Sequence, residues 1–341
     1  MKNNSIKETP ASRKKIAIVM GGYSSEYEIS VQSGNLVYRH LDKNKYTLYR
    51  VLILKDRWVA LDENQTEYPI NKADFSTNIA GEKINFDCVF NAIHGTPGED
   101  GLLAGYFESI GIRQTACDHY QAALTFNKRD CISVLRAYGI KTAINFALDK
   151  GDKIIPEKIL EKVGLPCFVK ANRAGSSFGV SKVKTESELL PAIENSFSED
   201  NEVIIESFLE GMEVDVCVIN HKGKIQALPV TEIVSENEFF DYKAKYLGES
   251  QEITPARLSD ADTKKVQNLA IRIFKHLKLK GLTRTEFIFH KGEPHFIEVN
   301  TIPGLSEASI VPQQALAAGI SLKELFENQI ELALDSTVVH Q

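Results

Sequence analysis

Two short apolar runs near the carboxyl end of the chain carry oxygen donors of the kind that bind magnesium. Glu286 lies in one predicted strand, and Glu298 and Asn300 lie two residues apart at the end of the next, so these two side chains point to the same face. Two carboxylates and an amide suit a magnesium ion that also holds phosphate oxygens. An isolated acidic residue is more often part of a solvated strand edge. Glu298, however, has apolar neighbours on both sides, so its charge needs compensation, which a metal ion would provide.

A lysine and a loop of small residues form a second candidate site. Lys170 ends the predicted strand Cys167–Val169 and shortly precedes the loop Gly175–Gly179. A lysine that faces the N–H groups of such a loop can hold phosphates, although a single lysine at a strand end is more often solvated. No Gly-Lys-Ser/Thr follows the loop, and no Gly-x-Gly-x-x-Gly follows the first strand. A Walker-type site and a dinucleotide-binding oxidoreductase are therefore disfavoured.

Two further loops follow predicted strands near the amino end. Residues 94–101, which begin with His94, follow the third strand, and residues 21–26, which end with Glu26, follow the first. Ligands of α/β sheets bind at the carboxyl ends of parallel strands. Each loop alone is a weak signal, because glycine turns are common and His94 could be a structural histidine. Together the loops predict a ligand site at one edge of the sheet.

The two loops near the amino end belong to an α/β unit that is predicted over residues 14–116. Lys15–Met20, Thr47–Leu54 and Phe86–Ala92 are apolar runs that end at polar or glycine residues, which is typical of buried strands. Ile29–Leu41 has the pattern of a helix. Strands that alternate with helices predict a parallel sheet.

Two further units, of α+β character, are predicted in the rest of the chain. Residues 117–205 form a smaller unit, and residues 206–341 form the third, while residues 1–13 are predicted to be a flexible tail. The elements expected in the second unit are a helix over Ala122–Tyr138, a hairpin of Leu165–Val169 and Val180–Val183, a helix over Glu188–Asn195 and a strand over Val203–Glu206. Those expected in the third are a strand over Glu213–Ile219, a helix over Asp260–Leu277, strands over Thr285–His290 and His295–Val299, and a helix over Leu322–Leu334.

The composition is that of a soluble globular protein. Of 341 residues, 43% are hydrophobic and 25% are charged, and the formal net charge of −6 argues against nucleic acid as a partner. No apolar run approaches the roughly 18 residues that a membrane helix needs, and the polar amino end does not resemble a secretory signal. The five cysteines have no metal or redox spacing, so we expect buried free thiols in a reducing cytoplasm.

Five motifs, in order from about Lys15 to Leu334, resemble those of D-alanine–D-alanine ligases, which belong to the ATP-grasp superfamily. The motifs are Gly21-Gly22-x-Ser24-x-Glu26 with Ile29-Ser30 and Ser33, His94-Gly95…Gly98-Glu99-Asp100-Gly101, Val169-Lys170…Gly175-Ser176-Ser177-x-Gly179-Val180, Asp241-Tyr242-x-Ala244-Lys245-Tyr246 and Glu298-Val299-Asn300-Thr301-x-Pro303-Gly304.

The resemblance implies an ATP-grasp fold of three domains, with ATP between the central and carboxyl-terminal ones. It further implies a cytoplasmic homodimer that uses ATP to join two D-alanines for peptidoglycan precursors, through a D-alanyl phosphate. Two Mg²⁺ ions, for which Mn²⁺ may substitute in such enzymes, would be bound by Glu286, Glu298 and Asn300. Lys128, Lys170 and Lys245 would neutralise the ATP phosphates, Glu206 and Leu209 would contact the adenine, and Glu213 would contact the ribose.

The substrate roles also come from the resemblance. Glu26 would bind the ammonium of the first D-alanine and would be linked to Ser176 and Tyr246 in a network that closes the Asp241–Tyr246 segment as a lid. His94 would contact substrate. Arg284 and the Gly304 N–H would stabilise the oxyanion. Ser309 and the Ile310 N–H would bind the carboxylate of the second D-alanine.

The sequence departs from the family pattern at a few positions. Glu286 stands where aspartate is usual, which lengthens one metal ligand by a methylene group but keeps the carboxylate. Ala171, Asn127 and the pair Thr115-Ala116 are further departures.

Two alternatives share much of this pattern. A D-alanine–D-lactate ligase usually lacks the lid tyrosine, so Lys245 and Tyr246 favour the dipeptide product. A catalytically silent nucleotide-binding protein is expected to have lost metal ligands or Arg284, and all of these are present.

Overall fold

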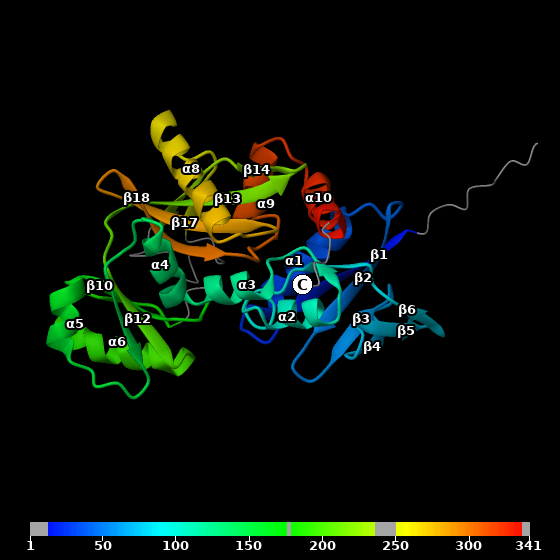
Figure 1. The fold of residues 1–341 in the computed structure, drawn as a ribbon, viewed down its shortest axis with the longest axis horizontal. Helices are drawn as coiled ribbons and strands as arrows, with labels where there is room; N and C mark the ends of the chain where they lie inside the picture. Colours follow the sequence, from blue (N-terminus) through cyan, green and yellow to red (C-terminus); the bar gives the residue numbers. More distant parts are fainter. Residues whose placement is uncertain (1–12, 176–178, 236–249, 336–341) are drawn as a thin grey trace, which may run out of the picture.

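The structure is a computed structural model, and it describes residues 13–175, 179–235 and 250–335. Figure 1 shows the amino-terminal sheet at one end of the molecule, a small sheet with its helices at the other, and the carboxyl-terminal sheet above and between them. The predicted tail lies outside the described residues except for Arg13. No helix in the described part of the chain is long and apolar enough to cross a membrane.

The amino-terminal sheet has eight strands, in the order β6-β5-β4-β3-β2-β1-β7-β8. The parallel half is as predicted, with β1 (Lys14–Gly21) between β2 (Tyr46–Ile53) and β7 (Cys88–Asn91). The sequence analysis missed an antiparallel extension. The elements it missed are β3 (Trp58–Leu61), β4 (Glu67–Asn71), β5 (Ser76–Ile79), β6 (Glu82–Ile84) and the short parallel strand β8 (Arg113–Gln114). The helices of this unit are α1 (Tyr27–His40) and α2 (Leu102–Ser109).

The small unit contains an antiparallel sheet in the order β11-β10-β12-β9. Its elements are β9 (Asn145–Asp149), α5 (Pro156–Val163), β10 (Cys167–Ala171), β11 (Ser181–Val183), α6 (Glu186–Glu199) and β12 (Glu202–Ser207). The predicted hairpin is confirmed, because Val169 pairs with Ser181 across β10 and β11. The boundary predicted between residues 205 and 206 falls inside β12, so we propose to place it after Ser207.

The structure has two helices where the sequence predicts one. The prediction of a single helix over Ala122–Tyr138 is wrong, because the chain forms α3 (His119–Phe126) and α4 (Lys128–Ala137). Asn127 between them has an extended conformation, and its side chain accepts a hydrogen bond from the Asp130 N–H. The apolar pattern continues across the break, while the cap ends one helix and starts the next. As a result, Lys128 lies in the first turn of α4.

The carboxyl-terminal sheet carries the predicted acidic strands. Its strands run in the order β16-β15-β13-β17-β18, with β14 paired to β13. Their bounds are β13 (Gly211–His221), β14 (Lys224–Ala227), β15 (Thr231–Ser235), β16 (Ser250–Ile253), β17 (Thr283–His290) and β18 (Glu293–Asn300). The helices are α8 (Asp260–His276), α9 (Ile310–Ala317) and α10 (Leu322–Asp335). The predicted long helix, strand pair and closing helix are thus confirmed.

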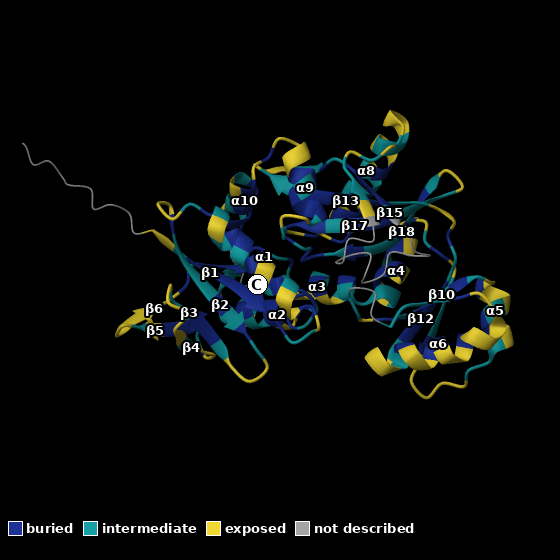
Figure 2. Ribbon diagram, turned by 180° about the vertical axis from the view of Figure 1, so that it is seen from behind, coloured by how far each residue is buried: buried dark blue, intermediate teal, exposed yellow. Residues whose placement is uncertain are grey.

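The last helix packs into the first sheet. Phe326 of α10 lies in one apolar cluster with Ile16, Ile18 and Phe90, and its ring meets the Phe90 ring edge-on at 5.7 Å between centroids. Figures 1 and 2 both place α10 beside α1. At the rim, Lys45 binds Glu327 and Glu331 of α10, while Lys323 binds Asp42 at 2.6 Å. The amino- and carboxyl-terminal units therefore share a core.

The five cysteines are buried free thiols, as predicted. Burial raises the pKa of Cys88, Cys117 and Cys131 to about 12. Because the thiolate is the reactive form, these side chains are inert packing groups.

Candidate active site

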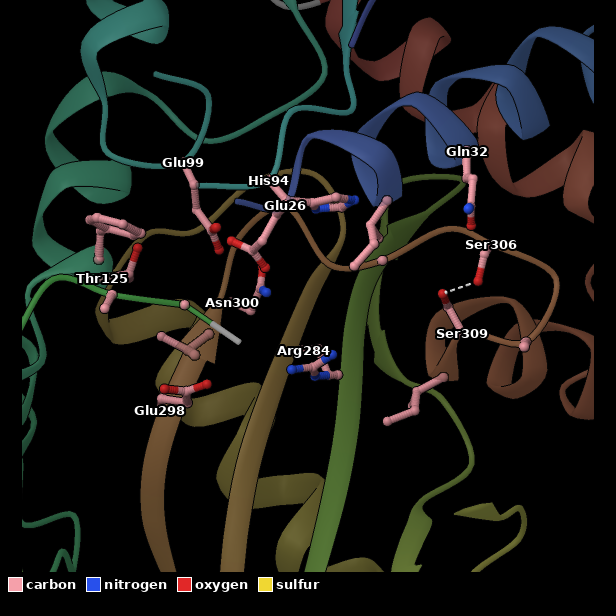
Figure 3. Close-up of a pocket in the computed structure, with 18 of the residues that line it drawn as sticks. Glu26, Gln32, His94, Glu99, Thr125, Arg284, Glu298, Asn300, Ser306 and Ser309 are labelled. Carbon is pink, nitrogen blue, oxygen red and sulfur yellow. Dashed lines mark hydrogen bonds between the residues drawn. The ribbon is translucent and has the colours of Figure 1, made fainter. Parts of the chain in front are cut away.

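The predicted site residues gather around two cavities that share a wall. The first, of about 270 Å³, lies where the loops after β1 and β7 meet the strands β17 and β18. The predicted residues that line it are Glu26, His94, Lys128, Arg284, Glu298, Asn300, Gly304, Ser309 and Ile310. Figure 3 shows Glu26, Glu99 and Asn300 on one side of this cavity, Ser306 and Ser309 on the other, and Arg284 between them.

The second cavity, of about 110 Å³, lies between the small sheet and the carboxyl-terminal sheet. The predicted residues that line it are Lys128, Lys170, Glu206, Leu209, Glu213, Glu286 and Glu298. Phe168, Val180, Ile288 and Ile297 give it apolar walls. Lys128, Ala174, Gly175 and Glu298 line both cavities, so a group transferred between two ligands would cross there. Ser176, Lys245 and Tyr246 lie outside the described residues.

The acidic residues of β17 and β18 face each other across the strand pair. Glu286 lies opposite Glu298, and Arg284 lies opposite Asn300. Like charges directly opposite in a sheet repel, so this pair requires cations. Arg284 supplies one through a 2.5 Å bond to Glu286, and the Lys128 ammonium lies 3.3 Å from the Glu298 carboxylate.

The donor set fits magnesium. Glu286 and Glu298 are carboxylates that both line the second cavity, and Asn300 adds an amide oxygen that also accepts from the Ile302 N–H at 2.8 Å. Within the described ranges, no group of three His, Cys, Asp or Glu side chains is arranged to hold a metal by itself. Magnesium commonly keeps only one or two protein carboxylates and takes its other ligands from phosphate and water. These two carboxylates suit an ion that arrives with a nucleotide.

Arg284 is a fixed cation at the centre of the site. Desolvation opposes its charge, but Asp215 and Glu286 outweigh this and raise the pKa of the guanidinium well above its usual value. Its Nε lies 3.6 Å from Asp215 Oδ1. Held between two strands, the side chain offers positive charge without rearrangement, which is the property an oxyanion site needs.

Two lysines line the second cavity, and one of them, Lys128, also lies on the shared wall. Lys170 binds Glu206 at 2.7 Å, and although desolvation lowers its pKa, Glu206 and the more distant Glu298 and Glu286 raise it. Lys128 donates to the Ala174 carbonyl at 2.7 Å, beside the glycine- and serine-rich loop. Both side chains are largely buried, at 14% and 15% exposure, so a phosphate bound to them would be shielded from water.

Glu26 lies between two glycines from different loops. A Cβ at Gly175 would stand 2.8 Å from Glu26 Oε2, and a Cβ at Gly95 would stand 3.2 Å from the same oxygen. Gly95 also has a positive φ of 66°. The glycines therefore let the loops close tightly on this carboxylate. The Ser24 hydroxyl donates to the His94 carbonyl, which joins the loop of Glu26 to the loop of Gly95.

His94 binds protein groups with both ring nitrogens. Its Nδ1 lies 2.7 Å from the Ile302 carbonyl, so Nδ1–H is the donor, and Nε2 lies 2.9 Å from the Ser33 hydroxyl, which donates to it. The Ser33 oxygen accepts in turn from the Leu305 N–H. Burial lowers the pKa of His94, so the ring is neutral. The predicted substrate residue thus lines the cavity but also connects the amino-terminal loop to the segment that carries Gly304.

The far side of the cavity is a helix start. Ser309 is the N-cap residue of α9, and Ile310 is its first residue. The N–H groups in this first turn and the helix dipole favour a carboxylate. Ser306 and Ser309 are joined by a 2.7 Å hydrogen bond between their hydroxyls. A Cβ at Gly304 would lie 2.9 Å from Ser309 Oγ, which explains the glycine.

The sequence analysis gave no role to two further acids of the first cavity. Glu99 is buried and accepts from the Gly95 N–H at 2.9 Å. Burial, with the neighbouring Glu26, raises its pKa to about 8. Glu252 enters from β16, and no motif marks it. Glu99 could have been noted from its place in the loop after β7, whereas Glu252 had no signal.

Two cavities that share one lysine and one carboxylate, at the contact of a small antiparallel sheet with the carboxyl-terminal sheet, are consistent with one class of protein. The fold is that of an ATP-grasp enzyme, an ATP-dependent carboxylate–amine ligase.

Comparisons with known proteins give the family. Residues 15–117 match the family model "D-ala D-ala ligase N-terminus", and residues 135–331 match "D-ala D-ala ligase C-terminus". A D-alanine–D-alanine ligase of Christiangramia forsetii is 66% identical over 95% of this chain and 99% of its own. The chain therefore belongs to the D-alanine–D-alanine ligase family.

Solved structures agree with this assignment. The Bacillus anthracis D-alanine–D-alanine ligase complexed with ATP is 29% identical, with a TM-score of 0.76 over 94% of this chain and 97% of its own. The VanG D-Ala:D-Ser ligase of Enterococcus faecalis is 32% identical, with a TM-score of 0.83 over 94% and 99% of the two chains. The ATP-grasp fold expected from the sequence is thereby confirmed.

Proposed function

We propose that this chain joins two molecules of D-alanine at the expense of ATP, through a D-alanyl phosphate. The observation that carries the proposal is the shared wall of the two cavities, where Lys128 and Glu298 face both the nucleotide side and the amino acid side. The 66% identity to a D-alanine–D-alanine ligase supports dipeptide synthesis over the D-Ala:D-Ser reaction of a relative at 32%.

ATP binds in the second cavity in this proposal. The adenine lies between apolar walls near Leu209 and Glu206, and the ribose lies near Glu213. Lys170 and Lys128 hold the phosphates, and Lys245 adds a third charge from the lid segment. Glu286, Glu298 and Asn300 would hold magnesium, or manganese in its place, which would supply positive charge to the transferring phosphoryl group.

The first D-alanine places its ammonium at Glu26, which the loops around Gly95 and Gly175 enclose. Its carboxylate then faces the shared wall, where it receives the phosphoryl group. Ser176 and Tyr246 complete this side when the lid closes. Closure excludes water, which would otherwise hydrolyse the acyl phosphate.

The second D-alanine binds its carboxylate at Ser309 and the Ile310 N–H. Its amine attacks the acyl carbon, and negative charge develops on the carbonyl oxygen. Arg284 and the Gly304 N–H stabilise that oxygen, and a donor of this kind is worth about 3–4 kcal/mol in comparable enzymes. His94 positions the Gly304 segment through Ile302. We further propose that the enzyme is a cytoplasmic homodimer that supplies peptidoglycan precursors.

The test is phosphate release with ATP and magnesium in the presence of D-alanine, L-alanine, D-serine or D-lactate, with products identified by mass. We expect release with D-alanine and a product of the mass of D-alanyl-D-alanine. Release that depends on L-alanine, or a mixed product that forms in preference to the dipeptide, would contradict the proposal.

A further inference from the structure

Four carboxylates of the described residues line the first cavity. Three of them lie on the side of Asn300 or on the wall that this cavity shares with the second one. Glu26 and Glu99 lie on the side of Asn300, and Glu298 lies on the shared wall (Figure 3). Glu252 enters from β16, the edge strand of the carboxyl-terminal sheet, opposite Ile233 of β15. Its contacts place it on the side of α9.

Glu252 is bound to the start of α9. Its Oε2 accepts from Gln313 Nε2 at 2.6 Å, and the same nitrogen donates to the Ala308 carbonyl at 2.8 Å. Gln313 lies one turn into α9, where its N–H bonds the Ser309 carbonyl. Both N–H bonds of the amide are therefore used to fix the carboxylate beside the segment that carries Ser309.

The second oxygen of Glu252 has no such anchor in the part of the chain that the structure describes. Among residues 13–175, 179–235 and 250–335, no group donates a hydrogen bond to Oε1. Burial raises the pKa of Glu252, while the Gln313 hydrogen bond and the charge of Arg284 lower it less. Arg284 on β17 is the charged group that acts on it, and its neighbours on α9 and β15, Gln313 and Ile233, are neutral.

We propose that Glu252 binds the ammonium of the second D-alanine and acts as its general base. An amino acid zwitterion whose carboxylate is held at the start of α9 needs an acceptor for its ammonium within the same cavity. Glu26 serves the first substrate, and Glu252 is the carboxylate attached to the second subsite. This role rests on the proposed function of the site.

The proton and electron count is complete. The ammonium gives one proton to the Glu252 carboxylate, and the resulting amine forms the C–N bond to the acyl carbon. The bond between that carbon and the phosphate oxygen breaks with its electron pair on the phosphate, which also takes the second nitrogen proton. The protonated Glu252 then returns its proton to water. A base with a raised pKa suits this transfer near neutral pH.

The test compares Glu252→Gln with wild type in two reactions. The first is dipeptide formation from D-alanine. The second is trapping of the D-alanyl phosphate by hydroxylamine, whose nitrogen is already unprotonated at neutral pH and needs no base. We expect Glu252→Gln to slow dipeptide formation about 100-fold at pH 7 and to leave hydroxamate formation unchanged. The defect should shrink about tenfold for each pH unit above 7, because solvent then deprotonates the amine.

Gln251→Ala is the matched control, because Gln251 is the exposed neighbour on the same strand and points to its other face. It should match wild type in both reactions. Glu252→Asp keeps a carboxylate with shorter reach and should lose less than Glu252→Gln. Equal loss of dipeptide and hydroxamate, or a defect that is constant with pH, would overturn the role of Glu252. Failure of the wild type to form the dipeptide at all would overturn the proposed function itself.

Discussion

Four described carboxylates of the first cavity differ in how their charge is compensated, and this difference distinguishes their proposed roles. Glu298 faces a lysine and a second carboxylate, as a metal ligand should. Glu26 is enclosed by two glycine loops, and Glu252 is fixed by an amide. Glu99 is buried and accepts a hydrogen bond from one backbone N–H. Because burial and the neighbouring Glu26 raise its pKa, its carboxyl group retains a proton.

The metal assignment is tested at Glu298. We expect Glu298→Gln to lower phosphate release at least about 100-fold, because the side chain loses the charge that holds the ion and faces Lys128. Steady-state phosphate release at saturating magnesium measures this. Glu293→Gln on the same strand is the control, since Glu293 is only partly buried and binds Lys265 and Lys141 away from the cavities. Near-normal release by Glu298→Gln would refute the assignment.

Glu99 should make stability depend on pH. Its pKa of about 8 in the folded protein lies above the ordinary value of 4.5, so the folded state retains the proton. This contribution is fully present below pH 4.5 and is lost as pH rises through 8. Glu99→Gln should therefore raise the free energy of unfolding by about 2–4 kcal/mol at pH 9 and change it little at pH 4.5. Thermal melts at both values measure this, and an equal shift at both would show that ionisation is not the cause.

At the scale of elements, the break at Asn127 sets the position of Lys128. The Asn127 side chain caps α4 and also accepts from the Asn172 side chain at 2.8 Å, next to the strand that carries Lys170. The cap thus fixes the lysine that lines both cavities.

Removal of this cap should affect both stability and nucleotide binding. We expect Asn127→Ala to cost about 1 kcal/mol of stability and to raise the KM for ATP more than that for D-alanine. Ser133→Ala on the exposed side of α4 is the control, because it keeps the cap. Equal KM values for ATP in the two variants would mean that the cap does not position Lys128.

The elements that the sequence predicted are those with long apolar runs. β1 is buried along six successive residues, and its pattern is plain. β3 to β6 have three to five residues each, and β4 contains Pro69, which argues against a strand paired on both sides. The helical periodicity continues through Asn127. It therefore does not reveal that the Asn127 side chain caps a new helix through a single hydrogen bond. The predicted site residues lie in motifs, whereas Glu252, which lines the same cavity as several of them, lies in none.

At the scale of the whole molecule, the amino-terminal sheet is stabilised by a helix from the other end of the chain. Phe326 is fully buried against Phe90 and lies in one cluster with Ile16 and Ile18. The first and the last of the three units predicted from the sequence therefore share one apolar core.

This shared core is tested by Phe326→Ala. We expect a loss of about 3–5 kcal/mol of stability and a matching loss of hydrogen-exchange protection in β1, although β1 lies at the opposite end of the sequence. Hydrogen exchange followed by mass spectrometry measures both regions. Leu316→Ala, at a side chain that is 57% exposed on α9, is the control. Loss of protection confined to α10 would show that the units unfold separately.

The ion pair between Lys45 and Glu331 joins residues that are 286 positions apart. A ribosome that adds 5–20 residues per second needs roughly 15–60 s to bridge that interval. During this time the face of the first sheet that α10 will cover has no partner from its own chain. Ile16, Ile18 and Phe90 share their cluster with Leu36 and Val37 of α1, but they then lack the cover of α10. The synthesis of α10 thus sets when the first strand is fully covered, and chaperones have that interval in which to bind it.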